Sequence, residues 1–254
     1  MSFIRSTEHA RFGLGYAALW NEFGDRNEME QPEVIAQRMH WRPEVTWNDH
    51  ALLYEMVVVT HGDDLAAVRD HTAIVDLAHP EEPVVVHLSH LLILPEHRGT
   101  GLTGWLRALP IRTARECLHR AHQAPRPITL LAEMEPADAR SVERQRRLAA
   151  YEKVGFLKID PRSVHYLQPD FRTPDQIDAA GGPMPLPLSL IIRRVKQEQD
   201  REIPGHEVRS TVESLYTMYA RSFRERDMVP NWESLKQYPA DHAIIPLVPP
   251  TRVD

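Results

Sequence analysis

The chain has 254 residues, which suffices for one large domain with a buried core or for a domain with a smaller addition. Hydrophobic residues make up 42% and charged residues 26%, as in ordinary globular proteins, and this balance argues against disorder. Asp and Glu outnumber Lys and Arg by 36 to 30, so we expect neither nucleic acid nor membrane as a partner. A cationic or amine-bearing small molecule suits the acidic balance better.

The first residues and the cysteine content indicate the cellular setting. Residues 1–16 lack the apolar segment of a signal peptide, and no later stretch reaches the length of a membrane span, so we expect a cytoplasmic protein. Cys117 is the only cysteine, which excludes an intrachain disulfide and a thiolate metal cluster. Its neighbours suggest the apolar face of a helix, and we interpret it as a core residue.

The N-terminal quarter predicts two helices followed by a strand pair. The helices are expected at Glu8–Phe23 and Pro32–Trp41, where apolar residues recur every three to four positions, with a turn at residues 24–27 between them. Two β-rich segments, Ala51–Thr60 and Ala66–Leu77, flank a polar turn and predict a hairpin.

The middle of the chain predicts a buried strand, a glycine-rich turn and a long helix. Val84–Leu94 is almost uninterrupted apolar sequence and is typical of a buried central strand. From Leu102 to about Ala121, apolar residues fall on one helical stripe, and Pro110 is expected to kink this helix.

Four further elements and a loop are predicted up to residue 195. They are a strand at Ile128–Ala132, a helix at Ser141–Val154 capped by Ser141 and ended by Gly155, a strand at Phe156–Ile159, a loop at Pro169–Pro187, and a strand at Leu188–Val195. This order of helices and strands predicts an α/β fold. We divide the chain into a domain of residues 1–196 and a C-terminal segment of residues 197–254.

The C-terminal segment predicts one amphipathic helix followed by a proline-rich tail. Its apolar stripe, which includes Tyr216, Tyr219 and Phe223, recurs at helical spacing. We expect this stripe to pack on the core of the chain or on a second subunit, so a homodimer is one possibility.

Three of the 11 glycines, Gly99, Gly101 and Gly104, lie between the predicted buried strand and the long helix. Glycine allows the backbone to approach a ligand closely, and the N–H groups at a helix start carry partial positive charge that suits phosphate. Arg98 adds a forked set of donors. This turn therefore predicts a pyrophosphate site, although a simple tight turn is the alternative because Gly-x-Gly alone is a weak signal.

Two segments resemble motifs of the GNAT N-acetyltransferase superfamily. The run Leu92–Gly101 is similar to its acetyl-CoA motif, with core pattern Arg/Gln-x-x-Gly-x-Gly/Ala, in which Arg98 and Gly101 match and Thr103 stands in the last position. Tyr151–Phe156 is similar to the family's Tyr-x-Lys-x-Gly-Phe segment. The resemblance extends over roughly residues 8–195, with a first strand that is missing or very short.

The resemblance implies a mixed, mostly antiparallel sheet flanked by helices, with the C-terminal helical extension as an addition. It also implies acetyl-CoA as co-substrate and transfer of its acyl group to a primary amine by direct attack in a ternary complex. The strand at residues 84–94 would diverge from the next one, and the pantetheine arm would enter between them. The implied cofactor-binding residues are Leu92, Ile93, Leu94, Arg98, Gly99, Thr100, Gly101, Leu102 and Thr103.

The reaction needs a base for the amine and an acid for the leaving thiolate. By resemblance, the Tyr151 hydroxyl lies near the cofactor sulfur, and a phenol is protonated at neutral pH and can donate. His87, in the buried strand, is our first candidate for the base because imidazole accepts protons near neutral pH. Strand alternation puts Ser89 on the same face as His87 and His90 on the other, unless a bulge intervenes.

Glu133, at the end of the neighbouring strand, is the second candidate for the base, since burial would raise its pKa towards a useful value. A metal site is not expected. Strand geometry separates His87 from His90, and neither His119 nor His122 has a carboxylate or third ligand close in sequence.

Other readings of the chain stay open at this point. The runner-up is a non-catalytic acyl-CoA sensor or assembly module with the same fold, and a partner-binding protein that keeps the fold and has lost the cofactor ranks last. The acceptor is a small-molecule or peptide amine that the sequence does not specify, and its site is expected between residues 24–29 and 169–187.

Overall fold

The computed structural model describes residues 1–24 and 28–253, so most of the turn predicted at residues 24–27 lies outside the described residues. The strands are β1 (Ser2–Ile4), β2 (His50–His61), β3 (Asp64–Asp76), β4 (Val84–Ile93), β5 (Ile128–Met134), β6 (Leu157–Ile159), β7 (Tyr166–Gln168), β8 (Leu186–Arg194), β9 (Glu202–Pro204) and β10 (Ile244–Val248). The helices are α1 (Phe12–Phe23), α2 (Pro32–Met39), the 3-10 helix η2 (Pro95–His97), α3 (Leu102–Arg120), α4 (Val142–Glu152), α5 (Pro174–Ala179), α6 (Gly205–Ala220) and α7 (Glu225–Leu235).

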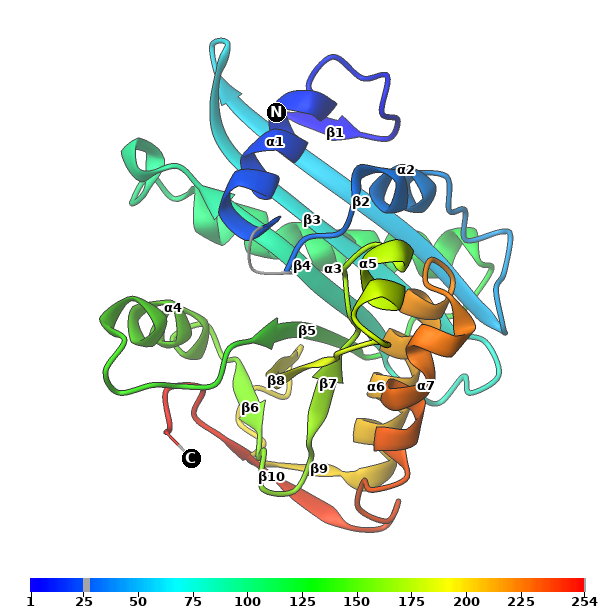
Figure 1. Ribbon diagram of the computed structural model, residues 1–254. Coiled ribbons are helices and arrows are strands. Elements are labelled where there is room, and N and C mark those ends of the chain that lie inside the picture. The colour runs from blue at the N-terminus through cyan, green and yellow to red at the C-terminus, as the bar shows by residue number, and fades with distance from the viewer. Residues whose placement is uncertain (25–27, 254) are drawn as a thin grey trace.

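The strands form one sheet in the order β1-β2-β3-β4-β5-β8-β6-β10-β9, with β7 attached to β8 (Figure 1). Among the described strands, β4 and β5 pair in parallel and the other neighbours pair antiparallel. The expected mixed, mostly antiparallel sheet of an α/β fold is therefore confirmed. A three-residue strand, β1, pairs with β2 where the resemblance implied a first strand that is missing or very short.

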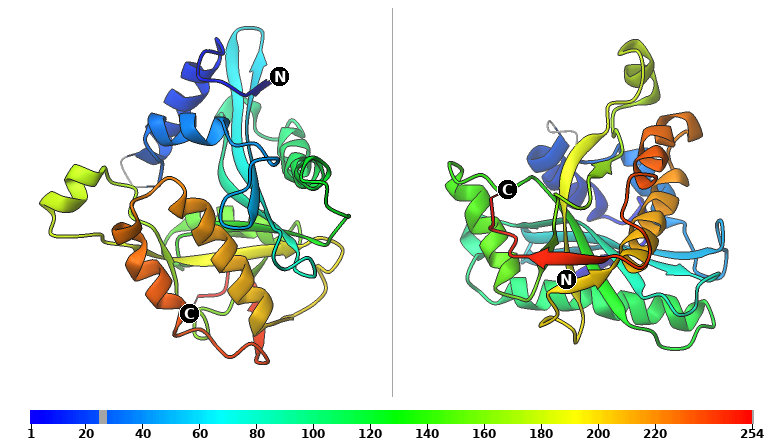
Figure 2. Two further views of the ribbon diagram at one scale, coloured as in Figure 1. Left: turned by 90° about the vertical axis from the view of Figure 1, so that its right-hand side faces the viewer. Right: turned by 90° about the horizontal axis from the view of Figure 1, so that it is seen from below.

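Helices cover both faces of the sheet (Figure 2). α3 packs across β2, β3 and β4 on one face, whereas α1, α2 and α6 contact the same strands from the other face. α3 runs through Pro110 without a break, and Cys117 on its inner side is fully buried, as predicted for a core residue. Burial raises the pKa of the Cys117 thiol to about 12, which keeps it protonated and unreactive.

Local signals set the ends of α4 as predicted. The Ser141 side chain accepts a hydrogen bond from the backbone N–H of Arg144, and Gly155 adopts a φ of +86° just after the helix. The loop predicted at residues 169–187 is partly wrong, because it contains α5, whose start is fixed by a capping box between Thr173 and Gln176. The strand β7, just before it, was also not predicted.

The C-terminal helical extension is present as two helices, α6 and α7, and it is continuous with the sheet. The prediction of a proline-rich tail is wrong, since β10 pairs with β6 on one side and with β9 on the other. In β10, Ile245 and Leu247 are buried while Pro246 between them is exposed, so the alternation of a strand persists around the proline. Residues 197–254 thus share the core of the rest of the chain.

The parallel pairing of β4 with β5 covers only the first part of β4. It runs from Val84 opposite Ile128 to His87 opposite Leu131 and then stops. Beyond this point β4 stays with β3, whereas β5 stays with β8 as far as Met134. The two strands therefore diverge in the middle of the sheet, as the resemblance implied.

A bulge in β4 lies at the same place. Thr72 of β3 pairs with His87, and Asp70, two residues earlier, pairs with His90, three residues further along β4. The extra residue in β4 reverses the alternation of side chains beyond it. His90 therefore points to the same face as His87, which settles the alternative left open by the sequence.

Candidate functional site

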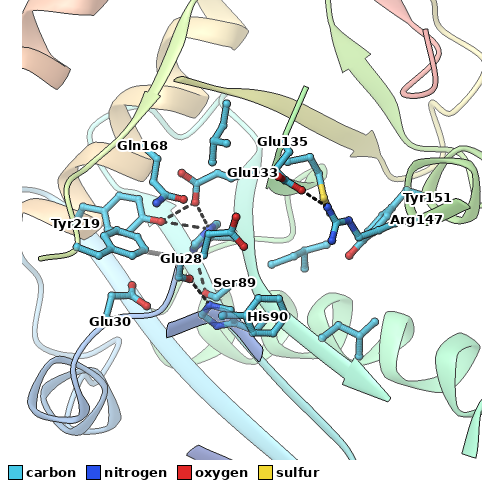
Figure 3. Close-up of a pocket in the computed structure, with 17 residues that line it drawn as sticks. Glu28, Glu30, Ser89, His90, Glu133, Glu135, Arg147, Tyr151, Gln168 and Tyr219 are labelled. Atoms are coloured by element: carbon cyan, nitrogen blue, oxygen red, sulfur yellow. Dashed lines mark hydrogen bonds and ion pairs between the residues drawn. The ribbon is translucent and has the colours of Figure 1, made fainter. Parts of the chain in front are cut away.

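A cavity lies where β4 and β5 diverge, and side chains from both faces of the sheet line it (Figure 3). Its volume is about 90 Å³, which is room for several water molecules or a small acyl group. The residues that line it and carry polar or aromatic groups are Phe23, Glu28, Glu30, His87, Ser89, His90, Glu133, Glu135, Arg147, Tyr151, Gln168, Phe171 and Tyr219. It thus brings together the three residues predicted for catalysis.

His87 and Glu133 form a buried pair on the α6 face of the sheet. His87 Nε2 lies 2.8 Å from Glu133 Oε2, and both side chains are less than a tenth exposed. Their strands explain the contact, because His87 stands opposite Leu131 and Glu133 follows Leu131 by two residues on the same face.

Glu133 accepts two further hydrogen bonds, from the hydroxyls of Tyr219 on α6 (2.6 Å) and Tyr166 on β7. Burial raises the pKa of this carboxyl, but the hydrogen bonds from His87, Tyr166 and Tyr219 outweigh burial, and its pKa is lowered. The expectation that burial raises the pKa of Glu133 to that of a base is therefore wrong. An ionised Glu133 instead fixes the orientation of the His87 ring.

This contact also determines which nitrogen of His87 is free to accept a proton. A carboxylate only accepts hydrogen bonds, so His87 Nε2 carries the hydrogen, and Nδ1 is left with its lone pair. Ser89 Oγ lies 3.2 Å from Nδ1 and donates to it. Ser89 also lines the cavity, so the chain Ser89, His87, Glu133 leads from the cavity into the protein.

His90 is a second buried histidine of this wall, and it is held in the charged form. Its Nδ1 lies 2.9 Å from Asp70 Oδ1, and its Nε2 lies 2.7 Å from the backbone carbonyl oxygen of Glu28. Burial lowers the pKa of His90, but the Asp70 carboxylate and these hydrogen bonds outweigh it and raise the pKa to about 9. With a hydrogen on each nitrogen, His90 has no free lone pair to act as a base.

Tyr151 lines the same cavity from the opposite face of the sheet, where it packs on the cluster beneath α3. Its ring meets the edge of Phe156 at a centroid distance of 5.1 Å, and the Arg107 guanidinium lies 5.4 Å from its centroid. These contacts hold the ring at the gap between β4 and β5. The predicted acid and the predicted base thus reach one cavity from opposite faces.

The glycine turn after β4 has the backbone conformation that the sequence predicted. Gly99 and Gly101 adopt φ values of +79° and +87°, which residues other than glycine rarely adopt. Gly101 directly precedes α3. A Cβ atom at Gly99, Gly101 or Gly104 would meet nothing within 4 Å, so the surface over the turn is open. The first N–H groups of α3 lack acceptors in the helix, so the turn fits a pyrophosphate.

The other residues predicted to hold the cofactor lie beside this turn. Arg98 Nε donates to the carbonyl oxygen of Ile93 at 3.1 Å, and Thr100 Oγ1 donates to the carbonyl oxygen of His97 at 2.7 Å. The backbone N–H of Leu94 donates to Ala66, so this donor is already used within the sheet. Leu92 and Ile93 are half-buried and pair with β3, and the half-buried Leu102 and Thr103 are the first residues of α3.

Among the arginines near the start of α4, Arg144 and Arg147 are held towards the cavity by a shared partner, Glu135. Their guanidinium groups lie 2.6 Å and 2.5 Å from its two carboxylate oxygens. Arg147 and Glu135 line the cavity (Figure 3). An arginine thus lines the cavity next to Tyr151 of the same helix.

Several residues of the site were not predicted from sequence. Tyr219 belongs to a helical stripe that was interpreted as packing only, and Tyr166 lies on a strand that was not predicted. Glu28 and Phe171 fall in the two segments expected to form the acceptor site, and both line the cavity. Helical spacing alone cannot separate a tyrosine that packs from one that also donates to a buried carboxylate.

Two further searches of the described residues bear on the class of protein. Within residues 1–24 and 28–253, no group of three or more His, Cys, Asp or Glu side chains is placed to hold a metal ion. None of the helices in this part of the chain has the length and apolar character needed to cross a membrane.

Comparison with known proteins finds similar structures but no similar sequences. No family model and no curated protein matches the chain. It is similar to an aminoglycoside 6'-N-acetyltransferase in complex with coenzyme A, with 13% identity over 77% of this chain and 97% of that chain and a TM-score of 0.40. It is also similar to a protein of Klebsiella pneumoniae subsp. pneumoniae assigned as an acyl-CoA N-acyltransferase (16% identity, 76% and 94% covered, TM-score 0.33).

A third similar structure is a Salmonella typhimurium protein assigned as an acetyltransferase, with acetyl-CoA bound. Its identity is 15%, the TM-score is 0.31, and the match covers 57% of this chain and 66% of that protein. At these TM-scores, substrate and mechanism have to be inferred from the site of the chain itself.

Proposed function

We propose that the chain is an acyl-CoA-dependent N-acyltransferase that uses acetyl-CoA and a primary amine. The observation that carries this proposal is the single cavity through the sheet, with a histidine–carboxylate pair on one face and Tyr151 on the other. The glycine turn follows β4 and leads into α3, and we assign the side of the cavity next to this turn to the cofactor. A two-substrate transfer needs such an arrangement, because each substrate enters from its own side.

Acetyl-CoA is expected to lie along β4, with its pyrophosphate on the backbone N–H groups from Gly99 to Thr103. Its pantetheine arm would follow the free edge of β4 through Leu92 and Ile93 and end in the gap beside Tyr151. The residues fit this ligand, since the turn is open and its glycines adopt the conformations that let the backbone approach phosphate.

On the α6 face, the acceptor amine would lie against Ser89. Its nitrogen loses a proton through the Ser89 hydroxyl to Nδ1 of His87, whose Nε2–H remains bound to Glu133. The ionised Glu133 stabilises the imidazolium that forms, as an orienting carboxylate does in other histidine bases.

The amine nitrogen then attacks the thioester carbon, so that a C–N bond forms and the C–S bond breaks. The Tyr151 hydroxyl gives its proton to the leaving thiolate. The attacking nitrogen, which becomes acidic once the C–N bond has formed, passes its second proton to the Tyr151 phenolate, and His87 releases the first proton to solvent. Proton transfer by positioned groups of this kind contributes about 10²- to 10⁴-fold to a rate.

The proposal is tested by following free thiol release from acetyl-CoA across a panel of primary amines, with the native chain and the Tyr151→Phe variant. We expect amine-dependent thiol release from the native chain and a loss of about 100-fold or more in kcat for the variant. Thermal unfolding is measured alongside, because a bound ligand raises Tm.

Two results would contradict the proposal. Acetyl-CoA that raises Tm without any amine-dependent thiol release would make the chain a cofactor sensor. If neither acetyl-CoA nor coenzyme A raised Tm, the chain would not bind the cofactor, and the remaining interpretation would be a partner-binding protein that has kept only the fold.

A further inference from the structure

The α6 side of the cavity is rich in carboxylates. Glu28, Glu30 and Glu133 line it, whereas His90 is the cation among the lining residues on this side. His90 is itself paired with Asp70, so its charge is neutralised within the wall. Glu30 is likewise paired with Arg38, so both of these pairs are neutral. The carboxylates of Glu28 and Glu133 make this side of the cavity acidic, which favours a cationic ligand.

Glu30 is the residue of this wall whose bonding is incomplete. It is 1% exposed, and its Oε1 is paired with the fully buried Arg38. Its Oε2 is buried and has no hydrogen-bond partner within the described part of the chain. A buried carboxylate oxygen without a donor destabilises the folded chain, so this position suits a donor supplied by a ligand.

Aromatic rings complete the wall. Phe23 lies against His90 with ring centroids 5.0 Å apart, and Phe171 lies against Tyr219 at 5.6 Å. Phe23, Phe171 and Tyr219 all line the cavity. Ring faces attract ammonium groups, and together with carboxylates they form an environment that selects organic cations over neutral molecules.

The Tyr219 ring connects this acidic position with the reacting position. Its centroid lies 5.6 Å from that of His87, and the guanidinium of Arg38, the partner of Glu30, lies 5.5 Å from it. The carboxylate of Glu30 and the base are therefore close to the same ring. Glu30, Ser89 and His87 also line one cavity, so a single small molecule can contact both positions.

We propose that the acceptor is a small diamine, or a small amine with one further ammonium group. One nitrogen lies at Ser89 and is acylated after it loses its proton to His87. The second nitrogen stays protonated, donates to Glu30 Oε2 and to the Glu28 carboxylate, and lies against the faces of the aromatic rings. This inference rests on the proposed function, because it names the acceptor of the same site.

The test compares 1,4-diaminobutane and 1,5-diaminopentane with 1-aminobutane as acceptors, with thiol release as the measurement. We expect kcat/KM to be about 10- to 100-fold higher for a diamine, as one charge-assisted contact in a buried site provides. In the variants Glu28→Gln and Glu30→Gln, the ratio of diamine to monoamine should fall towards one. The exposed Glu225→Gln on α7 is the control and should keep the native ratio.

Glu30→Gln leaves Arg38 without its charge partner and so risks misfolding, which circular dichroism would reveal. In that case the test uses the diamine-to-monoamine ratio of kcat/KM in Glu28→Gln. Equal kcat/KM for diamine and monoamine in the native chain would overturn the diamine assignment and leave acyl transfer standing. A lysine-containing peptide that is preferred over both diamines would overturn it as well.

If no amine releases thiol, the proposed function has failed, and the acceptor site is tested by calorimetry on the chain saturated with coenzyme A. Tighter binding of 1,4-diaminobutane than of 1-aminobutane, lost in Glu28→Gln, would support the site for a dication. Equal binding of the two amines would overturn it.

Discussion

The two sides of the cavity are built on different principles. On the α6 side, side chains from β4, β5, β7 and α6 form a hydrogen-bonded network around one carboxylate, Glu133. On the cofactor side, the main feature is backbone, a turn with two glycines at positive φ and an open surface above it. The side proposed for proton transfer thus consists of side chains with fixed partners, whereas the turn proposed for phosphate consists of backbone with open space above it.

The largest effect is expected where the network meets the reacting amine. In His87→Gln the side chain still fills the space but cannot accept a proton, so kcat should fall by about 10²- to 10⁴-fold. This kcat is measured from steady-state thiol release with a saturating amine. His119, which is exposed on α3, provides the matched control as His119→Gln and should behave like the native chain. A fall of less than threefold in His87→Gln would show that another group takes the proton.

The charged pair behind the network predicts how stability depends on pH. The pKa of His90 is raised from its ordinary value of 6.5 to about 9, so the charged form is bound more tightly in the folded chain than in the unfolded one. This contribution is complete below about pH 6.5 and is lost as pH rises through about 9. It corresponds to on the order of 3 kcal/mol of unfolding free energy.

Urea unfolding of the native chain and of His90→Gln at pH 6 and pH 9 isolates this contribution. The free energy of unfolding of the native chain should fall between the two values of pH by clearly more than that of the variant. Equal changes in both proteins would mean that the pair of His90 with Asp70 does not hold the charge that its geometry implies.

On the cofactor side, Gly101→Ala tests the backbone turn. An alanine at a φ of +87° is strained, so we expect a loss of about 1 to 2 kcal/mol in stability and a higher KM for acetyl-CoA. Gly13→Ala is the control, because Gly13 lies in α1 with ordinary helical φ and open space. That variant should be as stable as the native chain or up to about 1 kcal/mol more stable. An unchanged KM in Gly101→Ala would argue against a phosphate at this turn.

The smallest effect is expected at the start of α4, which carries Tyr151. Ser141→Ala removes the hydrogen bond to the N–H of Arg144 and should cost about 1 kcal/mol of unfolding free energy, measured by thermal or urea unfolding. Its kcat should stay near the native value, because the contacts of Tyr151 with Phe156 and Arg107 lie at the other end of the helix. A large loss of kcat would mean that the whole of α4, and not its C-terminal end alone, sets the position of Tyr151.

The same contrast decides what could be predicted from the sequence. The cofactor side is encoded in consecutive residues, since a buried strand, a glycine turn and a helix follow one another, and each leaves a local signal. The pair of His87 with Glu133 could also be predicted in part, because His87 lies in one predicted strand and Glu133 directly follows the strand that the resemblance places beside it. The bulge that turns His90 to the same face as His87 leaves no such local signal. From the sequence it could be stated only that a bulge, if present, would bring the two side chains to one face.

The network around Glu133 could not be predicted, because it depends on contacts between distant segments. Tyr219 lies 86 residues from Glu133 in the chain, and its helix shows only the spacing of a packed element. Residues 197–254 also looked like an addition, since β10 is short and proline-rich and pairs with strands far away in sequence. The pKa of Glu133 was predicted in the wrong direction for the same reason: burial was foreseeable and its three donors were not.

The central claim is that one cavity through the sheet receives the cofactor from one side and the acceptor from the other. A crystal structure with coenzyme A and 1,4-diaminobutane tests it most directly. We expect the sulfur between β4 and β5 beside Tyr151, the pyrophosphate on the N–H groups from Gly99 to Thr103, and one amine nitrogen at Ser89. Coenzyme A bound at another surface, with the gap filled by side chains of the protein, would contradict it.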